Sequence, residues 1–467
     1  MKADSQSNRS ARRLSRRQFI GSAAFASATF QIVPGSVLGL NGQTPPSEKL
    51  NIAGIGVSGQ GRGDLNQLKD QNIVALCDVD WAHAAGTFKE YPAAKKYKDF
   101  RKMLEEQKEI DAVVVATPDH MHAFASITAM KMGKHVYCEK PLTHSVWEAR
   151  QMTRVAREMK VATQMGNQGQ ASEETRRLCE LIWDGAIGPV REVHLWTDRP
   201  SNGLFNEYWP QGVARPKDTP NIPDTLAWDL WLGPALERPY HSAYLPFKWR
   251  GWWDFGTGAL GDIGCHYCDP IFRALKLGHP ISVEASSTRV NEETYPLASM
   301  VTYQFPAREG MPPLKMVWYD GGLRPARPEE LEEGREMGSN GKLLIGDKGK
   351  ILTVRIPNGP RGEVYRLIPE SKMKEYGEPP KKLPRSIGHY KEWVEACKGG
   401  QRAGSNFDWA GPLTEVVLLG NVALRLNLRE ELTTKKLLWD AASMRFTNSD
   451  AANHHLKRAY RKGWEIS

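Results

Sequence analysis

Three side chains that can bind or transfer a proton lie close together in GALGDIGCHYCDP, residues 258–270. Asp262, His266 and Asp269 are separated by four and three residues, so they share one face if a helix begins near Gly258. Histidine ionises near neutral pH and suits a general base that accepts a proton from an alcohol, and a carboxylate beside it can orient it. The segment therefore predicts acid–base chemistry at Asp262 and His266, with Asp269 in support.

The same segment permits two alternatives, one based on a metal ion and one on thiols. An H-x-x-D face on a helix can bind a metal ion, but the sequence shows no further matched ligands for it. Cys265 and Cys268 form a C-x-x-C pair, yet the sequence has no second pair that would complete a zinc site. We interpret both cysteines as small residues of a packed helix and expect no bound metal.

A glycine-rich turn near the start of the chain indicates a nucleotide site. In KLNIAGIGVSGQGRG an apolar run passes into Gly54, Gly56 and Gly59, which form G-x-G-x-x-G. The three glycines allow a tight turn, close approach of a pyrophosphate, and close packing of the following helix on the strand. The alternative is a glycine turn in some other βαβ unit. The residues expected to contact the cofactor here are Gly54, Gly56, Ser58, Gly59, Gln60 and Arg62.

An acidic residue specifies which dinucleotide the turn would accept. Asp78 ends the next apolar run, nineteen residues after Gly59. A carboxylate at the end of the second strand can accept hydrogen bonds from both ribose hydroxyls and would repel a 2′-phosphate. The sequence therefore predicts NAD as the cofactor rather than NADP.

Strand-like and helix-like segments alternate from about residue 47 to residue 165. Apolar strands are expected at 72–80, 111–118 and 134–141, with helices around 64–69, 100–107 and 120–132. Ser145 and Glu148 form an S-x-x-E capping box that begins another helix. Such alternation implies parallel pairing through right-handed crossovers. We predict an α/β fold in which this region is a doubly wound parallel sheet.

The stretch ATPDHMHAFASITAMKMGKHVYCEKPL, residues 116–142, carries T-P-x-x-x-H, G-K-H-V and E-K-P. With the glycine turn and the 258–270 segment, it resembles the Gfo/Idh/MocA oxidoreductase family over most of the chain after about residue 48. The resemblance implies an N-terminal Rossmann domain and a C-terminal α/β domain with an open, mainly antiparallel sheet that often makes oligomer contacts. It therefore implies a homo-oligomer.

The resemblance also implies roles for individual residues. Lys140 would bond a substrate hydroxyl beside the nicotinamide, after a cis bond to Pro141, and could stabilise the developing alkoxide. Asp262 and His266 match the family's catalytic pattern, whereas Asp119 stands where the family more often has Asn. His120 is interpreted as a surface residue. The further positions expected at the cofactor are Thr117, Pro118, His122, Glu139, Asn167 and Gln168.

Seven tryptophans lie between Trp196 and Trp253, interleaved with tyrosines and prolines. Flat aromatic faces next to polar groups suit sugar rings, although core packing explains most individual tryptophans as well. Arg250 and Trp252, just before the catalytic segment, are the expected substrate contacts. The predicted substrate is a carbohydrate or a cyclic polyol.

The first residues read as an export signal. SRRQFIG, residues 15–21, resembles a twin-arginine signal, and the apolar run after it is too short and too weakly apolar for a stable membrane anchor. We predict export by the twin-arginine machinery, which accepts folded proteins, to the bacterial periplasm. The expected divisions are a signal and linker at 1–44, the NAD-binding domain at 47–165, a substrate and oligomerisation domain at 166–445, and a tail at 446–467.

The net charge of +9 does not indicate nucleic-acid binding, because six basic residues and one acidic residue lie in residues 1–44. The predicted function is an NAD-dependent oxidoreductase whose tightly bound NAD is recycled internally. Two alternatives stay open. One is an NAD-dependent glycoside hydrolase that works by oxidation, elimination, addition and reduction, and the other is a sugar-binding protein without activity.

Overall fold

The computed structural model describes residues 48–201, 207–354, 364–426 and 436–466. The predicted signal and linker at 1–44 lie outside the described residues. All the elements below belong to the unit that begins at Leu50.

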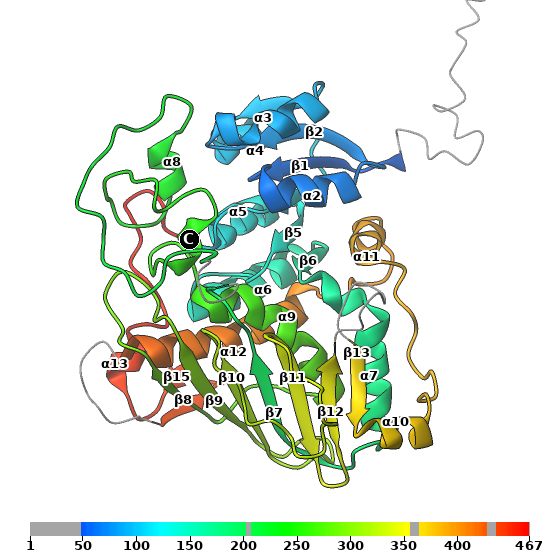
Figure 1. Cartoon of the computed structure of the whole chain (residues 1–467). Coiled ribbons are helices and arrows are strands. Elements are labelled where there is room, and N and C mark those ends of the chain that lie inside the picture. The colour runs from blue at the N-terminus through cyan, green and yellow to red at the C-terminus, as the bar shows by residue number, and fades with distance from the viewer. Residues whose placement is uncertain (1–47, 202–206, 355–363, 427–435, 467) are drawn as a thin grey trace, which may run out of the picture. The chain divides into compact units, whose positions relative to one another are not determined.

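A six-stranded parallel sheet forms the first layer, in the order β3-β2-β1-β4-β5-β6 (Figure 1). Its strands are β1 (Asn51–Ile55), β2 (Asn72–Cys77), β3 (Lys95–Tyr97), β4 (Ala112–Val115), β5 (His135–Glu139) and β6 (Thr163–Gly166). Its helices are α2 (Gly59–Gln67), α3 (Trp81–Glu90), α4 (Phe100–Glu106), α5 (Asp119–Lys131) and α6 (Val146–Met159). The strand order reverses direction at β1, as in a doubly wound fold, so the predicted Rossmann sheet is confirmed.

Helices cover both faces of this sheet because successive strand residues point to opposite sides. Ile52 and Val114 pack with α2, α3 and α11 (His389–Cys397), whereas Ala53 and Val113 pack with α4, α5 and α6. Helix α2 begins at the glycine turn itself, five residues earlier than the predicted start at Asp64. A helix from the second half of the chain, α11, thus completes the first layer.

A nine-stranded sheet follows, in the order β13-β12-β11-β7-β10-β9-β8-β14-β15. Only the β7 and β10 pair is parallel among its pairs in the described residues, so the predicted open and mainly antiparallel sheet is confirmed. Its strands are β7 (Val190–Trp196), β8 (Ser282–Ser287), β9 (Ser299–Phe305), β10 (Leu314–Tyr319), β11 (Gly341–Gly346), β12 (Lys350–Val354), β13 (Val364–Ile368), β14 (Leu437–Asp440) and β15 (Arg445–Phe446).

Two long helices lie between the sheets: α9 (Gly258–Leu275) and α12 (Phe407–Leu426) (Figure 1). Helix α12 contacts α6 of the first layer as well as α9, β8 and β9. The shared core thereby fixes α9, which carries the predicted acid–base residues, against the parallel sheet. The remaining helical segments are η3 (Gln168–Ala171), α7 (Glu173–Trp183), α8 (Trp228–Leu232), η4 (Lys248–Gly251), α10 (Glu370–Tyr376) and α13 (Asp450–Asn453).

The predicted capping box at the start of α6 is confirmed. Ser145 Oγ accepts a hydrogen bond from the Glu148 amide, and Glu148 Oε2 accepts one from the Ser145 amide at 3.0 Å. The second oxygen of the Glu148 carboxylate remains available for contacts elsewhere in the fold.

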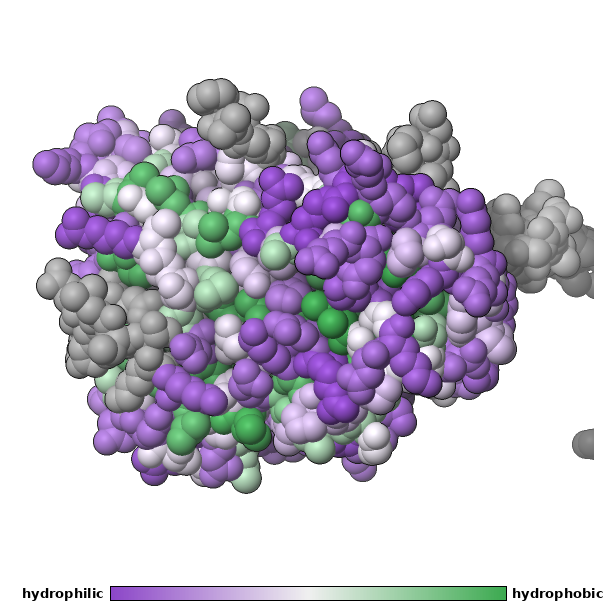
Figure 2. All heavy atoms as spheres, turned by 60° about the horizontal axis from the view of Figure 1, so that its bottom comes forward, coloured by the Kyte–Doolittle hydropathy of each residue, from purple (hydrophilic) through white to green (hydrophobic). Residues whose placement is uncertain are grey.

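The surface seen in Figure 2 is mostly hydrophilic, with apolar residues in small separate groups. The homo-oligomer stays a prediction.

Candidate active site

A cavity of about 390 Å³ opens where the parallel strands end. Gly56 follows β1, Asp78 follows β2, Thr117 follows β4 and Glu139 ends β5, and all four line the cavity. In open α/β sheets the carboxyl ends of the strands at the reversal point form the ligand crevice. The opposite wall comes from residues 230–266, so both halves of the chain build one site.

The glycine turn leaves open space beside Gly59. Gly59 has φ +51°, and a Cβ added there would meet no atom within 4 Å, so nothing fills the space in front of it. The role of close helix packing belongs to Gly61, where a Cβ would lie 2.0 Å from the Gly56 carbonyl oxygen. The sequence motif assigned that role to Gly59, and the structure corrects it.

Asp78 is tied to the glycine turn. Its Oδ2 accepts hydrogen bonds from the Val57 amide at 2.9 Å and from Ser58 Oγ at 3.2 Å, and its Oδ1 accepts one from the Asp80 amide at 2.9 Å. Burial raises the pKa of Asp78, and these hydrogen bonds oppose that rise. The carboxylate therefore has a fixed position beside the predicted ribose site.

The predicted catalytic lysine reaches across the cavity to α9. Asp262 Oδ1 accepts hydrogen bonds from Lys140 Nζ at 2.6 Å and from Arg250 Nε at 2.9 Å. Burial alone would raise the pKa of Asp262, but the charges of Lys140 and Arg250 lower it well below its usual range. The three residues form an ionised cluster with two positive groups around one carboxylate.

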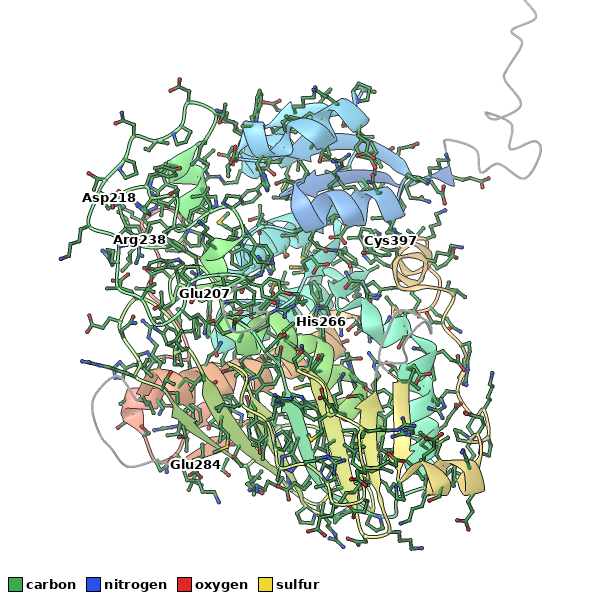
Figure 3. The ribbon with its side chains drawn as sticks, viewed as in Figure 1. Glu207, Asp218, Arg238, His266, Glu284 and Cys397 are labelled. Carbon is green, nitrogen blue, oxygen red and sulfur yellow. The ribbon has the colours of Figure 1, made fainter. Side chains whose placement is uncertain are left out.

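His266 lines the cavity one turn further along α9 (Figure 3). Burial and the charge of Lys140 lower the pKa of His266 to about 3, and the Asp262 carboxylate opposes them. Its imidazole is therefore neutral near pH 7. The sequence led us to expect that Asp262 orients His266. Among the described residues, Asp262 instead forms hydrogen bonds with Lys140 and Arg250, and it influences His266 through its charge.

Asp269 does not join the cluster. Its carboxylate accepts hydrogen bonds from Arg273 Nε at 2.9 Å and from Trp409 Nε1 at 2.7 Å, and it is nearly fully buried. The three side chains predicted on one helix face are thus divided. Asp262 and His266 lie beside the cavity, whereas Asp269 forms an ion pair with Arg273 behind it.

Glu139 belongs to a buried polar network beside Lys140. Gln168 Nε2 donates to Glu139 Oε1 at 2.8 Å, and Tyr390 of α11 donates to Asp64 Oδ1 at 2.7 Å. Burial, together with the nearby Asp64 carboxylate, raises the pKa of Glu139 to about 8. Burial also raises the pKa of Asp64 to about 6. One network therefore joins α2, β5, η3 and α11 next to the cavity.

Two histidines near the start of α5 hold the site together. His122 lies between the carbonyl oxygens of Pro141 at 2.7 Å and Thr117 at 2.8 Å, which links the turns after β4 and β5. His120 is fully buried between the carbonyl oxygens of Trp231 and Phe255, so its interpretation as a surface residue is wrong.

Asp119 lies behind the catalytic cluster. Thr257 Oγ1 donates to its Oδ2 at 2.5 Å, whereas its buried Oδ1 has no hydrogen-bond partner among the described residues. Burial raises the pKa of Asp119 to about 7, although Arg250 and Lys140 oppose the rise. A protonated Asp119 resembles the Asn that is commoner in the family.

Neither a metal site nor a redox dithiol emerges from the cysteine pair. In the part of the chain that the structure describes, no group of three or more His, Cys, Asp or Glu could hold a metal ion. Cys265 and Cys268 are buried in α9, and burial raises the pKa of the Cys265 thiol to about 12.

None of the helices in the described ranges has the length and apolar character that a membrane span requires.

Comparison with known proteins identifies the chain. Family models match residues 49–167 as the oxidoreductase family's NAD-binding Rossmann fold and residues 200–308 as its C-terminal alpha/beta domain. The chain belongs to the Gfo/Idh/MocA family. Its Rossmann domain is accordingly an NAD-binding domain.

The relatives cover only part of this Gfo/Idh/MocA member. Inositol 2-dehydrogenase from Salmonella typhimurium is 27% identical over 150 residues, 31% of this chain and 44% of that protein. Glycosyl hydrolase family 109 protein 1 from Akkermansia muciniphila is 25% identical over 169 residues, 34% of this chain and 35% of that protein. The chain thus spans less than half the length of these relatives.

A solved structure shares the fold over a longer stretch. The crystal structure of the WlbA dehydrogenase from Bordetella pertussis, in complex with NADH and UDP-GlcNAcA, matches 84% of this chain and 99% of that chain. The TM-score is 0.55 and the sequence identity is 16%. This likeness supports the Gfo/Idh/MocA fold alone.

The residues present fit NAD. The open space before Gly59, the start of α2 and the fixed Asp78 carboxylate lie in one cavity with Lys140. The start of α2 would direct backbone amides toward the pyrophosphate, and Asp78 would receive the adenosine ribose. The nicotinamide would then lie on the β4 to β6 side, near Lys140 and His266.

Most of the predicted site residues meet at this cavity of the Gfo/Idh/MocA fold, but five do not line it. Gly54 packs within β1, Arg62 pairs with Glu90 on the surface, and Asp262 is held just behind the wall by its two positive partners. Asn167 is fully buried, and its side-chain amide has no hydrogen-bond partner among the described residues. The predicted residues that line the cavity are Gly56, Ser58, Gly59, Gln60, Asp78, Thr117, Pro118, His122, Glu139, Lys140, Gln168, Arg250 and His266.

The fifth exception is Trp252, which corrects the expectation that it contacts the substrate. Its indole is 1% exposed, donates to the Ala243 carbonyl oxygen at 2.9 Å, and packs on Tyr244. Trp231 and Trp249 line the cavity instead. The sequence pointed to the aromatic cluster but gave no sign of which rings face the cavity, and it gave no sign at all of Trp464, which also lines it.

Proposed function

We propose that this protein is an NAD-dependent oxidoreductase that acts on a sugar, a glycoside or a cyclic polyol and retains its NAD. The observation that carries the proposal is the pairing of Lys140 with Asp262 at 2.6 Å beside a neutral His266, at the cavity that the nucleotide turn opens into. A site for the cofactor and a set of groups for proton transfer thus share one space.

The protein's own groups suit the oxidation of a secondary alcohol. Bound NAD supplies an acceptor for the hydride of the reacting carbon. Lys140 and Arg250 place two positive groups around the single Asp262 carboxylate, so the cluster keeps a net positive charge. Lys140 can therefore donate a hydrogen bond to the substrate oxygen and stabilise the negative charge that develops on that oxygen. His266 lines the cavity with a neutral imidazole, and its unprotonated nitrogen is the group that would accept the hydroxyl proton.

The aromatic wall supports a carbohydrate or polyol substrate. Trp231, Phe247 and Trp249 line the cavity, and the Arg250 guanidinium lies 4.0 Å from the Phe247 ring centroid. Flat rings beside a charged fork can cover the apolar C–H face of a sugar while polar groups bind its rim. The relative named inositol 2-dehydrogenase is consistent with a polyol.

Export supports retention of NAD. If the SRRQFIG segment directs the folded chain to the periplasm through the twin-arginine machinery, NAD has to be loaded before export. A soluble pool of NAD is not expected there, so each turnover would return the cofactor to its starting state. We therefore infer paired oxidation and reduction on one bound cofactor.

The proposal is tested by the small molecules that the purified chain carries. Denaturation should release NAD or NADH close to one per chain, and a panel of sugars, glycosides and polyols should identify a substrate that changes the absorbance of the bound cofactor. His266→Gln should lower turnover by about 10²- to 10⁴-fold with cofactor content unchanged. No bound cofactor, and no binding when NAD is added, would refute the proposal.

A second candidate is a glycoside hydrolase that uses the same NAD in each cycle to oxidise a ring carbon, eliminate the aglycone, add water and reduce again. The similarity to glycosyl hydrolase family 109 protein 1 favours including it. Sugar release from a glycoside that requires bound NAD but produces no net NADH would support this candidate. A Lys140→Ala variant with full turnover would show that Lys140 takes no part in the reaction. That result would favour the other alternative, a sugar-binding protein that has no activity of its own.

A further inference from the structure

The C-terminal tail returns to the Rossmann domain and is anchored there. Arg458 Nε lies 2.9 Å from Glu148 Oε1, and Tyr460 donates to the same oxygen at 3.1 Å. The Glu148 side chain is fully buried, and its other oxygen serves the capping box of α6. Tyr460 also packs edge to face on Phe124 of α5, with ring centroids 5.1 Å apart. The tail is therefore held by the first layer and does not hang free.

A second set of contacts ties the tail to the segment that carries α8. The Arg461 amide donates to the Pro234 carbonyl oxygen at 3.1 Å, and Arg461 Nε donates to the Gly233 carbonyl oxygen at 2.9 Å. Arg461 also pairs with Asp229 of α8. Leu230 and Trp231 of this helix line the cavity. The tail thus joins the two walls of the cavity.

One side chain of the tail, Trp464, lines the cavity. Trp464 is 8% exposed, its ring lies 4.3 Å from the Arg101 guanidinium, and its centroid is 6.5 Å from that of Phe100. Arg101 donates hydrogen bonds to the Asp99 carboxylate, and Asp99 and Phe100 line the same cavity. Contacts with α4 therefore fix the position of the indole beside the cavity.

These contacts place Trp464 at the adenosine end of the cavity. Asp99 and Phe100 follow β3, and the Asp78 amide donates to the Tyr97 carbonyl oxygen at 3.0 Å, so this corner adjoins the predicted ribose site. In a doubly wound fold the adenosine half of a dinucleotide lies over the first strands and the nicotinamide half over the later ones. Trp464 would therefore face the half of the cofactor that takes no part in the chemistry.

We propose that residues 456–466 form a strap over the adenosine half of the NAD cavity, and that Trp464 is a cofactor-contacting residue that slows the release of NAD. The strap is bonded to α6 through Arg458 and Tyr460 and to the α8 segment through Arg461. A departing adenosine would therefore have to displace an indole carried by a doubly anchored segment. This inference rests on the proposed function in one respect, because it gives a structural cause for the retention of NAD.

The test measures the rate at which NADH leaves the full chain. Energy transfer from protein tryptophans to bound NADH is followed after a chase with excess NAD. Trp464→Ala should release NADH about tenfold faster or more, since stacking on an aromatic ring stabilises a base by that order. Trp464→Phe should stay within about threefold of wild type. The matched control is Trp183→Ala, whose indole is 38% exposed and does not line the cavity.

Equal release rates in wild type, Trp464→Ala and Trp183→Ala would overturn the strap while leaving the proposed function intact. Rapid release from wild type itself would refute retention of NAD, whatever the variants do. If Trp464→Ala fails to fold, Arg461→Ala serves as the second variant, because it removes the side-chain bonds between the tail and the α8 segment and keeps the indole. It should release NADH severalfold faster, and a rate equal to wild type would overturn the strap. Amide hydrogen exchange gives an independent readout: NADH should protect residues 456–466, and unchanged exchange would also count against the proposal.

Discussion

Lys140 Nζ lies 2.6 Å from Asp262 Oδ1, and each side chain is only 13% exposed. The lysine comes from the turn after β5 of the parallel sheet and the aspartate from α9, 122 positions later in the chain. Their contact is therefore possible only after the two halves of the chain have packed together. It links assembly of the fold directly to assembly of the reacting groups.

This contact predicts strong coupling between two substitutions. Lys140→Met removes a positive group from Asp262, and Asp262→Asn leaves Lys140 Nζ without its carboxylate. Each should lower kcat/KM by about 10²- to 10³-fold. Asp262→Asn leaves two positive groups, Lys140 and Arg250, without their carboxylate in a mostly buried site, and Lys140→Met removes one of the two. The double variant should therefore be more stable than the sum of the two losses by about 1–3 kcal/mol. Urea unfolding of the four proteins measures that coupling energy, and strict additivity would contradict the pairing.

The buried carboxyl of Asp119 predicts a pH dependence of stability. Its folded pKa of about 7 lies above the ordinary value of 3.8, so the folded state binds the proton more tightly than the unfolded state does. The stability that the protonated group allows is present below pH 4 and is lost as the pH rises to about 7. Asp119→Asn carries no charge at any pH and should be more stable than wild type at pH 8 by about 2–4 kcal/mol.

Thermal unfolding of both proteins from pH 4 to pH 9 tests this. The difference in Tm should be small at pH 4 and grow up to about pH 7. Thr257→Val is the useful control, because it removes the hydrogen bond to Asp119 without removing the carboxyl. A constant difference across the range would show that Asp119 does not titrate there.

Short motifs made most of the site predictable, because they encode local geometry. The glycine turn, Asp78, the Glu139-Lys140-Pro141 turn and His266 each depend on residues close in sequence that the backbone of a βαβ unit or a helix places directly. The parallel sheet follows from the same local alternation. Those predictions required no knowledge of how distant segments pack.

The remaining features depend on tertiary packing. Trp464 reaches the cavity because Arg458 and Arg461 anchor the tail to α6 and to the α8 segment, which are distant from the tail in the sequence. Tyr390 joins the Asp64 network from α11, 326 positions later in the chain. The role of Gly61 was missed because a motif counts glycines but does not measure how close the helix comes to Gly56.

Two neighbouring tryptophans should behave differently when removed. Trp252 is 1% exposed in an aromatic cluster, so Trp252→Ala should lower the free energy of unfolding by about 3–5 kcal/mol. Trp249 lines the cavity beside Arg250, so Trp249→Ala should change stability by about 1 kcal/mol at most and raise KM for the substrate. Urea unfolding and steady-state kinetics separate the two effects. A larger rise of KM in a stable Trp252→Ala protein would restore the original assignment.

Two glycines of α2 provide a matched pair for the nucleotide turn. At Gly61 a Cβ would lie 2.0 Å from the Gly56 carbonyl oxygen, a backbone atom that cannot move without shifting the turn. Gly61→Ala should therefore destabilise the protein by about 2–4 kcal/mol and weaken NAD binding. At Gly63, in the same helix, a Cβ would meet nothing within 4 Å, so Gly63→Ala should stabilise by about 0.5–1 kcal/mol and leave NAD binding unchanged. Calorimetric titration with NAD and urea unfolding of both variants measure the two quantities. If Gly61→Ala matched Gly63→Ala in both, α2 could not lie as close to the turn as the structure places it.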